Sequence, residues 1–261
     1  METTLKATLL AHTKLSNYFH KDSDLFYTWS ENATDGQVVA LAAIRTCYSA
    51  NKPTEIVAKE GAKYFGSKAS DGGAGTDADR LFRHIFASKH TSTLEHISFT
   101  FAIEGVSRAL LAQLTRHRAG FSFSVQSQRY VRMGRDDRSG GFDYVMPPTV
   151  TEDKKVDHSP SLDFTHYISA VDHFGDAMEM IQDVYDELRS LGVPAEDARA
   201  VLPNAAATNL VMTANLTALL SFYSKRKKGR GAQAEITELA EALRREVVAV
   251  EPWTDQFFEE V

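Results

Sequence analysis

Residues 113–130 bring cationic, hydroxyl and carboxamide side chains together in one stretch, QLTRHRAGFSFSVQSQRY. Arg116, His117 and Arg118 are consecutive, and serine, glutamine and arginine side chains close the stretch. Arginine presents a planar fork of donors that matches phosphate and carboxylate oxygens. Such a stretch suits a ligand rich in phosphate and carbonyl acceptors. The alternative is a solvated helix end whose cations complement the C-terminal dipole, and the stretch alone does not separate the two.

A second polar stretch, HTSTLEH at residues 90–96, comes just before the clearest strand pattern of the chain. Its two histidines and one glutamate invite a metal site, but no thiolate or tight pairing completes a known ligand spacing. We therefore expect no metal. The stretch is better explained as a polar turn that brings hydroxyl and imidazole groups to the end of the sheet. An ion pair between Glu95 and His96 at the entry to the strand is the simpler alternative.

Two further cationic features lie in the C-terminal half. Arg199 is the only charge in the apolar segment ARAVLP at residues 198–203, and it must find a partner or reach solvent because an unpaired buried charge is costly. Residues 225–230, KRKKGR, form the densest basic run. That run is typical of a solvated helix end or a nucleic-acid patch, and it also attracts small phosphorylated molecules.

Two residues could suggest nucleophilic catalysis. Cys47 falls on the apolar side of an expected helix, where a buried and inert thiol is the ordinary outcome. Ser127 has neither a nucleophile elbow around it nor an identifiable base. We expect neither to act as a nucleophile.

Bulk composition is that of an ordinary globular protein. The chain has 261 residues, with 43% hydrophobic and 25% charged side chains. Its net charge of −6 argues against a dedicated nucleic-acid binder. A single cysteine, no signal-peptide layout and no run of roughly 20 apolar residues favour a cytoplasmic protein that does not enter a membrane.

The elements that must position these residues can be read from periodicity and capping. Strands are expected at residues 6–12, 97–103 and 209–212, with Ile97, Phe99, Phe101 and Ile103 on one face of the second. Longer helices are expected at residues 35–48, 54–65, 77–88, 106–116, 159–190, 216–225 and 232–248. Asp35 is expected to cap the helix at 35–48, and Ser159 the helix at 159–190. Pro194 lies in the first turn of a short helix. The pattern predicts one α+β domain over residues 1–261, with a small, mainly antiparallel sheet flanked by helices and a long helix in the second half.

The order of residues 113–130 resembles the signature of the flavin-dependent thymidylate synthases, in which Arg-His-Arg is followed by a spacer and then by Ser-x-Arg-Tyr. The spacer in this chain, residues 119–126, has eight residues where the family usually has seven. Further segments also look like the family's: Arg-x-Cys-Tyr-Ser around Cys47, the His-to-His stretch at 90–96, Ala-Arg-x-Val-Leu-Pro around Arg199, and Ala-Gln-x-Glu-Ile at 232–236.

The resemblance implies a role for each matching residue. Those that would contact flavin are His90, Ser92, Glu95, Arg116, His117, Arg118, Asn215 and Ser221. Those that would contact the nucleotide dUMP are Gln113, Arg116, Gln126, Ser127, Gln128, Arg129, Arg199 and Arg226. Arg226 would be the catalytic residue, polarising the N3–O4 edge of the pyrimidine. Asn215 is by itself simply a helix N-cap, and Ser221 stands where the family has a second asparagine.

The same resemblance implies the chemistry. FAD would be the cofactor, dUMP the methyl acceptor, 5,10-methylenetetrahydrofolate the carbon donor and NADPH the reductant, giving dTMP, tetrahydrofolate and NADP. It also implies a homotetramer whose active sites are shared between subunits, which would explain why no Rossmann glycine fingerprint is found. The alternatives are a nucleic-acid-binding protein that uses the basic run at 225–230, and a nucleotide phosphotransferase or hydrolase. The second would need a metal or phosphate loop that the sequence does not offer.

Overall fold

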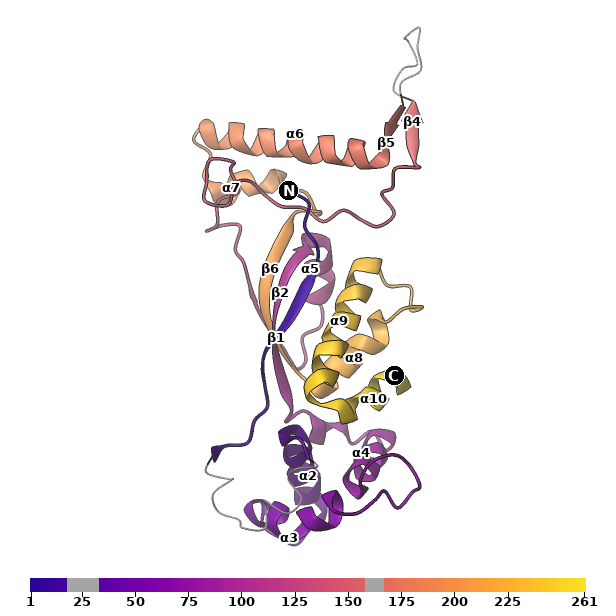
Figure 1. The fold of residues 1–261 in the computed structure, drawn as a ribbon. Coiled ribbons are helices and arrows are strands. Elements are labelled where there is room, and N and C mark those ends of the chain that lie inside the picture. Colours follow the sequence, from indigo (N-terminus) through magenta and orange to yellow (C-terminus); the bar gives the residue numbers. More distant parts are fainter. Residues whose placement is uncertain (18–32, 158–166) are drawn as a thin grey trace.

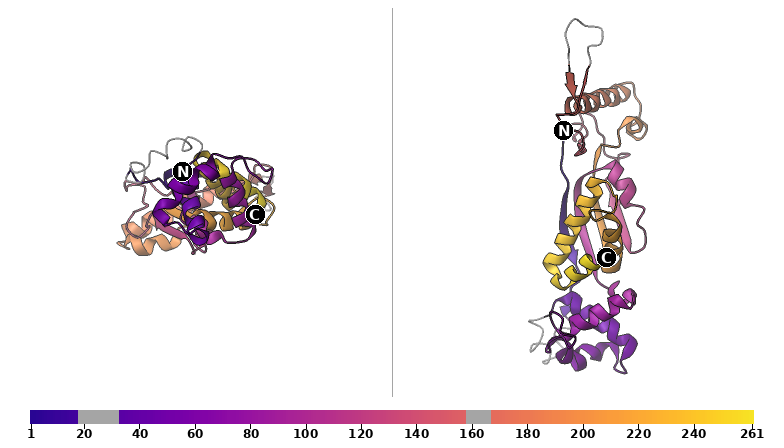
Figure 2. Two further views of the ribbon diagram at one scale, coloured as in Figure 1. Left: turned by 90° about the horizontal axis from the view of Figure 1, so that it is seen from below. Right: turned by 90° about the vertical axis from the view of Figure 1, so that its right-hand side faces the viewer.

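The computed structural model describes residues 1–17, 33–157 and 167–261. The molecule is elongated, as Figures 1 and 2 show: a sheet forms its middle, three helices lie at one end, and a long helix lies across the other end. This arrangement confirms the predicted α+β class with a small antiparallel sheet and a long helix in the second half. That a single domain extends over residues 1–261 stays a prediction.

Four strands make the central sheet in the order β1-β2-β6-β3, and every neighbouring pair is antiparallel. Their bounds are Lys6–His12 for β1, Ser98–Ser107 for β2, Ala207–Asn215 for β6 and Phe121–Val125 for β3. The apolar side chains predicted to share one face of β2 are all fully buried: Ile97, Phe99, Phe101 and Ile103. Alternation with a period of two therefore identified the core face of the central strand.

Helices cover only one face of this sheet. These are α5 (Arg108–Leu114), α8 (Leu216–Arg226) and α9 (Ala234–Val250), with the short α10 (Asp255–Glu260) beside them (Figures 1 and 2). Together with the sheet they enclose the larger of two hydrophobic clusters. The other face of the sheet is left open, as an antiparallel sheet permits.

The three helices at one end of the molecule agree with prediction in type and nearly in extent: α2 (Asp35–Tyr48), α3 (Pro53–Phe65) and α4 (Asp77–Ala87). The predicted cap of α2 is wrong by one residue. Thr34, not Asp35, is the N-cap, and it forms a reciprocal capping box with Gln37. Such a box satisfies two backbone N–H groups that the first turn of a helix leaves without partners.

A buried carboxylate fastens this helical end to the C-terminal part of the chain. Glu251 is fully buried and accepts hydrogen bonds from the Gly36 backbone N–H at 3.1 Å, from Trp253 Nε1 at 2.6 Å and from the Thr34 hydroxyl. Burial raises the pKa of Glu251 above its ordinary value, against the effect of these donors. A side chain at Gly36 would collide with the carboxylate, which explains the glycine at that position.

The long helix α6 (Ala170–Ser190) begins later than the expected helix at residues 159–190. Ser159 and Pro160 lie outside the described residues. The observed N-cap is Ser169, whose Oγ accepts a hydrogen bond from the Asp172 backbone N–H at 3.0 Å. Just before α6, β4 (Lys155–Asp157) pairs with β5 (Tyr167–Ser169), and the inner side of α6 packs on the smaller hydrophobic cluster.

Strand β2 runs further than predicted, so the expected helix at residues 106–116 is wrong at its start. The strand continues to Ser107 through a bulge at Gly105, whose φ of +64° lies in the left-handed region that favours glycine. The expected strand at residues 209–212 likewise extends over all of β6, and β3 was not predicted at all.

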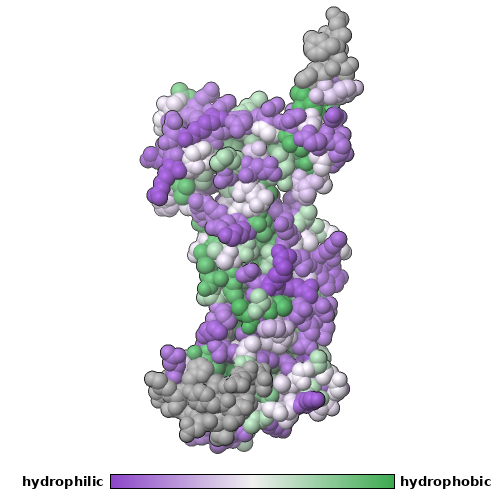
Figure 3. Space-filling model, viewed as in Figure 1, coloured by the Kyte–Doolittle hydropathy of each residue, from purple (hydrophilic) through white to green (hydrophobic). Residues whose placement is uncertain are grey.

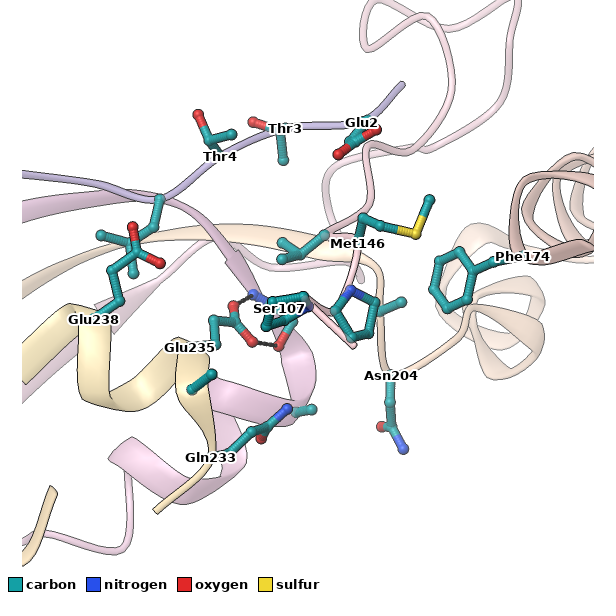
Figure 4. Close-up of a pocket in the computed structure, with 17 residues that line it drawn as sticks. Glu2, Thr3, Thr4, Ser107, Met146, Phe174, Asn204, Gln233, Glu235 and Glu238 are labelled. Atoms are coloured by element: carbon teal, nitrogen blue, oxygen red, sulfur yellow. Dashed lines mark hydrogen bonds between the residues drawn. The ribbon is translucent and has the colours of Figure 1, made fainter. Parts of the chain in front are cut away.

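The junction between β2 and α5 is held by one buried carboxylate (Figure 4). The Ser107 backbone N–H and hydroxyl donate to the two oxygens of Glu235, at 2.7 and 2.5 Å, and the Ser107 hydroxyl accepts from the Leu110 backbone N–H at 3.0 Å. Glu235 opens α9, so the bonds join α9 to the N-cap of α5. They lie on the wall of a pocket of about 400 Å³ that none of the predicted site residues lines.

Replacing Glu235 with glutamine should lower stability. Its amide would turn an N–H₂ group toward one of the Ser107 donors, leaving a buried donor without a partner, which costs about 1–3 kcal/mol. For a protein of this size that is a fall of roughly 2–10 °C in the melting temperature, measurable by calorimetry. The control is Glu238→Gln, an exposed residue of the same helix that should change little. Equal melting temperatures for Glu235→Gln and Glu238→Gln would contradict the assignment.

Candidate active site

The three consecutive cations lie in a turn that follows α5. The chain leaves the helix after Leu114, and the Phe121 N–H bonds to the Arg118 carbonyl oxygen at 3.2 Å, which sends the chain into β3. Gly120 makes this turn possible, because its φ is +75° and a side chain there would strike Asn215. Arg116 and Arg118 are exposed and have no acidic partner among the described residues, so both guanidinium groups can meet an anion.

His117 is half-buried between two aromatic rings and a guanidinium group. Its ring meets Phe222 edge-on, with 5.0 Å between ring centroids. Arg226 Nε donates to His117 Nε2 at 3.4 Å, so in this arrangement the imidazole is neutral and carries its proton on Nδ1. Burial, followed by repulsion from Arg226, Lys225 and Arg116, lowers the pKa of His117 below its ordinary value.

Hydrogen bonds join the start of α8 both to this turn and to the predicted flavin segment at residues 90–96. The Asn215 N–H donates to the Gly120 carbonyl oxygen at 3.1 Å, and Asn215 Oδ1 caps α8 by accepting from the Ala218 N–H at 2.8 Å. Thr217 Oγ1 donates to the carbonyl oxygen of Thr91 at 2.8 Å, in the 3-10 turn Thr91–Leu94. Segments up to 126 residues apart in sequence therefore lie side by side.

Just before the 3-10 turn, His90 Nδ1 shares a hydrogen bond of 2.8 Å with the Tyr48 hydroxyl. Ser92 and Glu95 are exposed, as is Ser221 on α8. The alternative of an ion pair between Glu95 and His96 is not seen in the described residues. Lys89, just before His90, has a φ of +60°, an uncommon conformation for a residue with a side chain and one often found at functional turns.

A largely apolar pocket of about 760 Å³ lies beside this turn, and His90 and Ser92 line it together with Cys47. The expectation of a buried thiol is wrong, because Cys47 is exposed. The helical pattern placed the thiol on the apolar side of α2 correctly, but that side faces the pocket at this point. The pocket has an imidazole and a hydroxyl, those of His90 and Ser92, on its wall.

The nucleotide residues predicted at 126–129 gather beyond the other end of β3. The backbone N–H of Gln126 continues the ladder to the Asn209 carbonyl oxygen at 2.8 Å. Ser127 Oγ accepts from the Arg129 N–H at 3.2 Å. Gln128 is 7% exposed, and its Nε2 has no hydrogen-bond partner among the described residues. A buried amide donor without a partner is costly, so this group is suited to a ligand oxygen.

Three arginines lie at this end of the sheet, and two of them bond to Glu196. Arg129 Nε donates to Glu196 Oε2 at 2.5 Å, and Arg199 Nε donates to the backbone carbonyl oxygen of Glu196 at 2.9 Å. Arg108, at the start of α5, has no acidic partner among the described residues. Its pKa is lowered by burial and then by repulsion from Arg199. Three guanidinium groups with a single carboxylate leave excess positive charge, which favours an anionic ligand.

Arg108 was missed by sequence reasoning, although a signal existed. It occupies the first position of a helix, where the dipole favours acidic side chains, so a cation there is electrostatically out of place. Gln113, the remaining predicted residue on α5, points instead toward the start of α9, where its Nε2 donates to Gln233 Oε1 at 2.6 Å.

Apart from Gln113, the predicted residues form two groups in one chain, and Arg108 joins the second. The first, here called the histidine group, comprises His90, Ser92, Glu95, residues 116–118, Asn215, Ser221 and Arg226. The second, the arginine group, comprises Arg108, residues 126–129 and Arg199. The five residues of β3 separate them, a span of roughly 17 Å at 3.3–3.4 Å per residue. One chain therefore does not bring Arg226 next to Arg129.

The basic run at residues 225–230 is not a uniform solvated patch. Arg226 faces His117, and Lys227 Nζ donates to the carbonyl oxygen of Val261. In the described part of the chain no group of three or more metal-binding side chains occurs, and no helix is long and apolar enough to cross a membrane.

Comparisons with known proteins give a consistent result. The family model described as thymidylate synthase complementing protein matches residues 30–253. A protein of Geobacter sulfurreducens named flavin-dependent thymidylate synthase is 37% identical over 222 residues, covering 85% of this chain and 82% of its own. One with the same name from Mycobacteroides abscessus is 30% identical over 229 residues, covering 86% and 80%.

Among solved structures, the UMP/dUMP methylase PolB from Streptomyces cacaoi, bound with 5-Br dUMP, is similar with a TM-score of 0.65. The match covers 100% of this chain and 97% of that one at 22% identity. At this identity the likeness concerns the fold.

The lowered pKa of His117 predicts a pH dependence. In the folded protein this histidine binds a proton less readily than in the unfolded chain, so stability should fall as the pH drops through its ordinary pKa of 6.5. His117→Gln stays neutral throughout. The fall in melting temperature between pH 7.5 and pH 5.5 should therefore be smaller in the variant, and equal falls would show that His117 does not contribute. Because both proteins contain Glu251, whose raised pKa acts in the opposite direction, the difference between them isolates the histidine.

Proposed function

This chain belongs to the family of thymidylate synthase complementing proteins and is a flavin-dependent thymidylate synthase, and we propose that it makes dTMP from dUMP with FAD bound at the histidine group. The observation that supports the site most strongly is a set of hydrogen bonds: Asn215 and Arg226 bond to the turn after α5, and Thr217, at the start of α8, bonds to Thr91. They gather the segments that the family resemblance implies for flavin, although these are far apart in sequence.

The residues of the histidine group fit a flavin dinucleotide. Arg116 and Arg118, both exposed and without acidic partners in the described residues, suit the pyrophosphate. The apolar pocket next to His90 and Ser92 suits a flat ring. Ser221 would offer a hydroxyl where the family has a carboxamide. When bound, the flavin would supply the electrons that reduce the transferred one-carbon unit to a methyl group.

The arginine group is proposed to hold the 5′-phosphate of dUMP. Arg129 and Arg199 are joined in this role by Arg108, whose guanidinium has no acidic partner among the described residues. The unpartnered Nε2 of Gln128 adds a donor, and Ser127 lies beside it. Fixing the phosphate orients the base, and orientation is a major source of rate enhancement.

Arg226 is proposed to stabilise negative charge on the pyrimidine as its ring is activated. It is half-buried and held by His117, and a neutral histidine leaves the full positive charge of the guanidinium available. The remaining reactants are proposed from the family resemblance: 5,10-methylenetetrahydrofolate gives the one-carbon unit and NADPH gives the hydride. The products are then dTMP, tetrahydrofolate and NADP.

We further propose that the active site is completed between copies of the chain in a homotetramer. The histidine and arginine groups lie at opposite ends of β3, so a nucleotide that contacts both needs a second chain. The open face of the sheet could pack against a partner. Thr8, Ala102, Val211 and Ser124 form one row across all four strands, and Val211 is 41% exposed. Figure 3 shows hydrophobic residues gathered at mid-height, beside the strands.

Replacing Arg226 with lysine should remove most of the activity. A lysine keeps the charge but loses the planar fork, and loss of one such donor lowers kcat by about 10²–10³-fold. The measurement is dTMP formation from dUMP, methylenetetrahydrofolate and NADPH by the FAD-loaded protein. Lys225→Gln, an exposed neighbour on the same helix, is the control and should stay active. A wild-type protein that takes up no FAD and forms no dTMP would overturn the proposed function itself.

Replacing Val211 with glutamate should break up the assembly. A charge in the middle of the open face would be buried without a partner on association, whereas in the single chain it would remain in water. Light scattering coupled to gel filtration should show a smaller species, with activity lost in parallel. Val156→Glu, at an exposed position on β4, should leave the assembly intact. If Val211→Glu keeps the wild-type mass, the open face is not the contact between subunits.

A further inference from the structure

Glu196 lies at the centre of the arginine group and contacts two of its members in different ways. Its carboxylate accepts from Arg129 Nε at 2.5 Å, and its backbone carbonyl accepts from Arg199 Nε at 2.9 Å. The two partners of this one residue are the arginines assigned above to the nucleotide phosphate. The carboxylate therefore lies where an anionic ligand would be bound.

Carboxylate and phosphate compete for the same donors. An arginine binds either group best through two parallel N–H bonds from its planar fork. Glu196 already uses Nε of Arg129, so a phosphate can take a two-bond contact along that edge only after the carboxylate has moved away. Burial, and then repulsion from Arg199, lower the pKa of Arg108, and until the phosphate binds, the Glu196 carboxylate supplies the negative charge beside Arg129.

The exposure of the Arg129–Glu196 pair makes the exchange easy. The two side chains are 57% and 44% exposed, and ion pairs this open to water contribute little. The contrast within the same protein is the pair of Arg45 and Glu60, 21% and 13% exposed, in which Glu60 also accepts from Ser49 and Asn51. The Arg45–Glu60 pair is therefore expected to stay intact, whereas the Arg129–Glu196 pair can separate at a small cost in free energy.

We propose that Glu196 is an internal counter-ion that occupies Arg129 until the 5′-phosphate of the nucleotide displaces it. This rests on the proposed function, because it takes the arginine group to be the phosphate site. Glu196 is a positioning residue: it holds Arg129 extended toward the site and weakens phosphate binding by the free energy needed to break the pair.

The experiment compares Glu196→Gln with wild type in the FAD-loaded protein, using titration calorimetry with dUMP and with deoxyuridine, which lacks the phosphate. We expect the dissociation constant for dUMP to fall about two- to fivefold, the range set by an exposed ion pair, and that for deoxyuridine to stay the same. Asp197→Asn is the matched control. It removes the same charge from the neighbouring residue, which has no ion pair in the described part of the chain, and should have a smaller effect.

Three results would overturn the proposal. One is an unchanged or weaker affinity of Glu196→Gln for dUMP, a second is an equal gain for deoxyuridine, and a third is an equal gain in Asp197→Asn, which would mean general electrostatics. A wild-type protein that fails to bind dUMP would instead count against the proposed function. In that case inorganic phosphate serves as the probe, and Glu196→Gln must bind it more tightly than wild type for the counter-ion role to stand.

Discussion

The bond between Ser107 and Glu235 is the constraint on which the arrangement of the site depends. It fixes the point at which β2 stops and α5 turns back along the sheet, and it joins that point to the first turn of α9. Because α5 begins there, Arg108 lies at one end of the sheet and the Arg-His-Arg turn comes out near the other. A carboxylate shielded from water holds a backbone N–H and a hydroxyl more firmly than an exposed one would. The positions of Arg108 and of the Arg-His-Arg turn therefore depend on one buried junction.

Charge is distributed unevenly between these two groups. The histidine group keeps a neutral imidazole against a guanidinium, so that the cation is oriented without being neutralised. The arginine group gathers three cations, and the Glu196 carboxylate bonds to one of them. Each arrangement is unfavourable in a protein without ligand, since like charges repel and burial disfavours them. Unfavourable clusters of this kind are typical of functional sites, where the ligand supplies the missing charge.

Much of the fold could be predicted from the sequence, because local patterns of apolar and polar residues indicate the type of most helices and strands. The alternation in β2 gave the correct type and nearly the correct start of the strand, and the helical periodicity of α2 and α4 gave nearly the correct bounds. The Phe-Ser-Phe-Ser-Val alternation of β3 was equally clear, but it lay inside a segment regarded only as a spacer between two motifs. What no local pattern contains is proximity between distant segments. Arg129 and Glu196 are 67 residues apart, and their contact depends on how the loop after β3 meets the turn after α6.

Strand β3 also limits how this protein can vary. Its side chains alternate, with Phe121 and Phe123 packed on the core and Ser122 and Ser124 toward the open face. Inserting one residue within the strand would exchange the two faces and turn every later side chain around. Length changes between the two motifs must therefore be absorbed in the flanking turns, such as the one at Gly120. The spacing between the motifs can therefore change in the turns on either side of β3, whereas within the strand only a change of two residues keeps the same side chains on the core face.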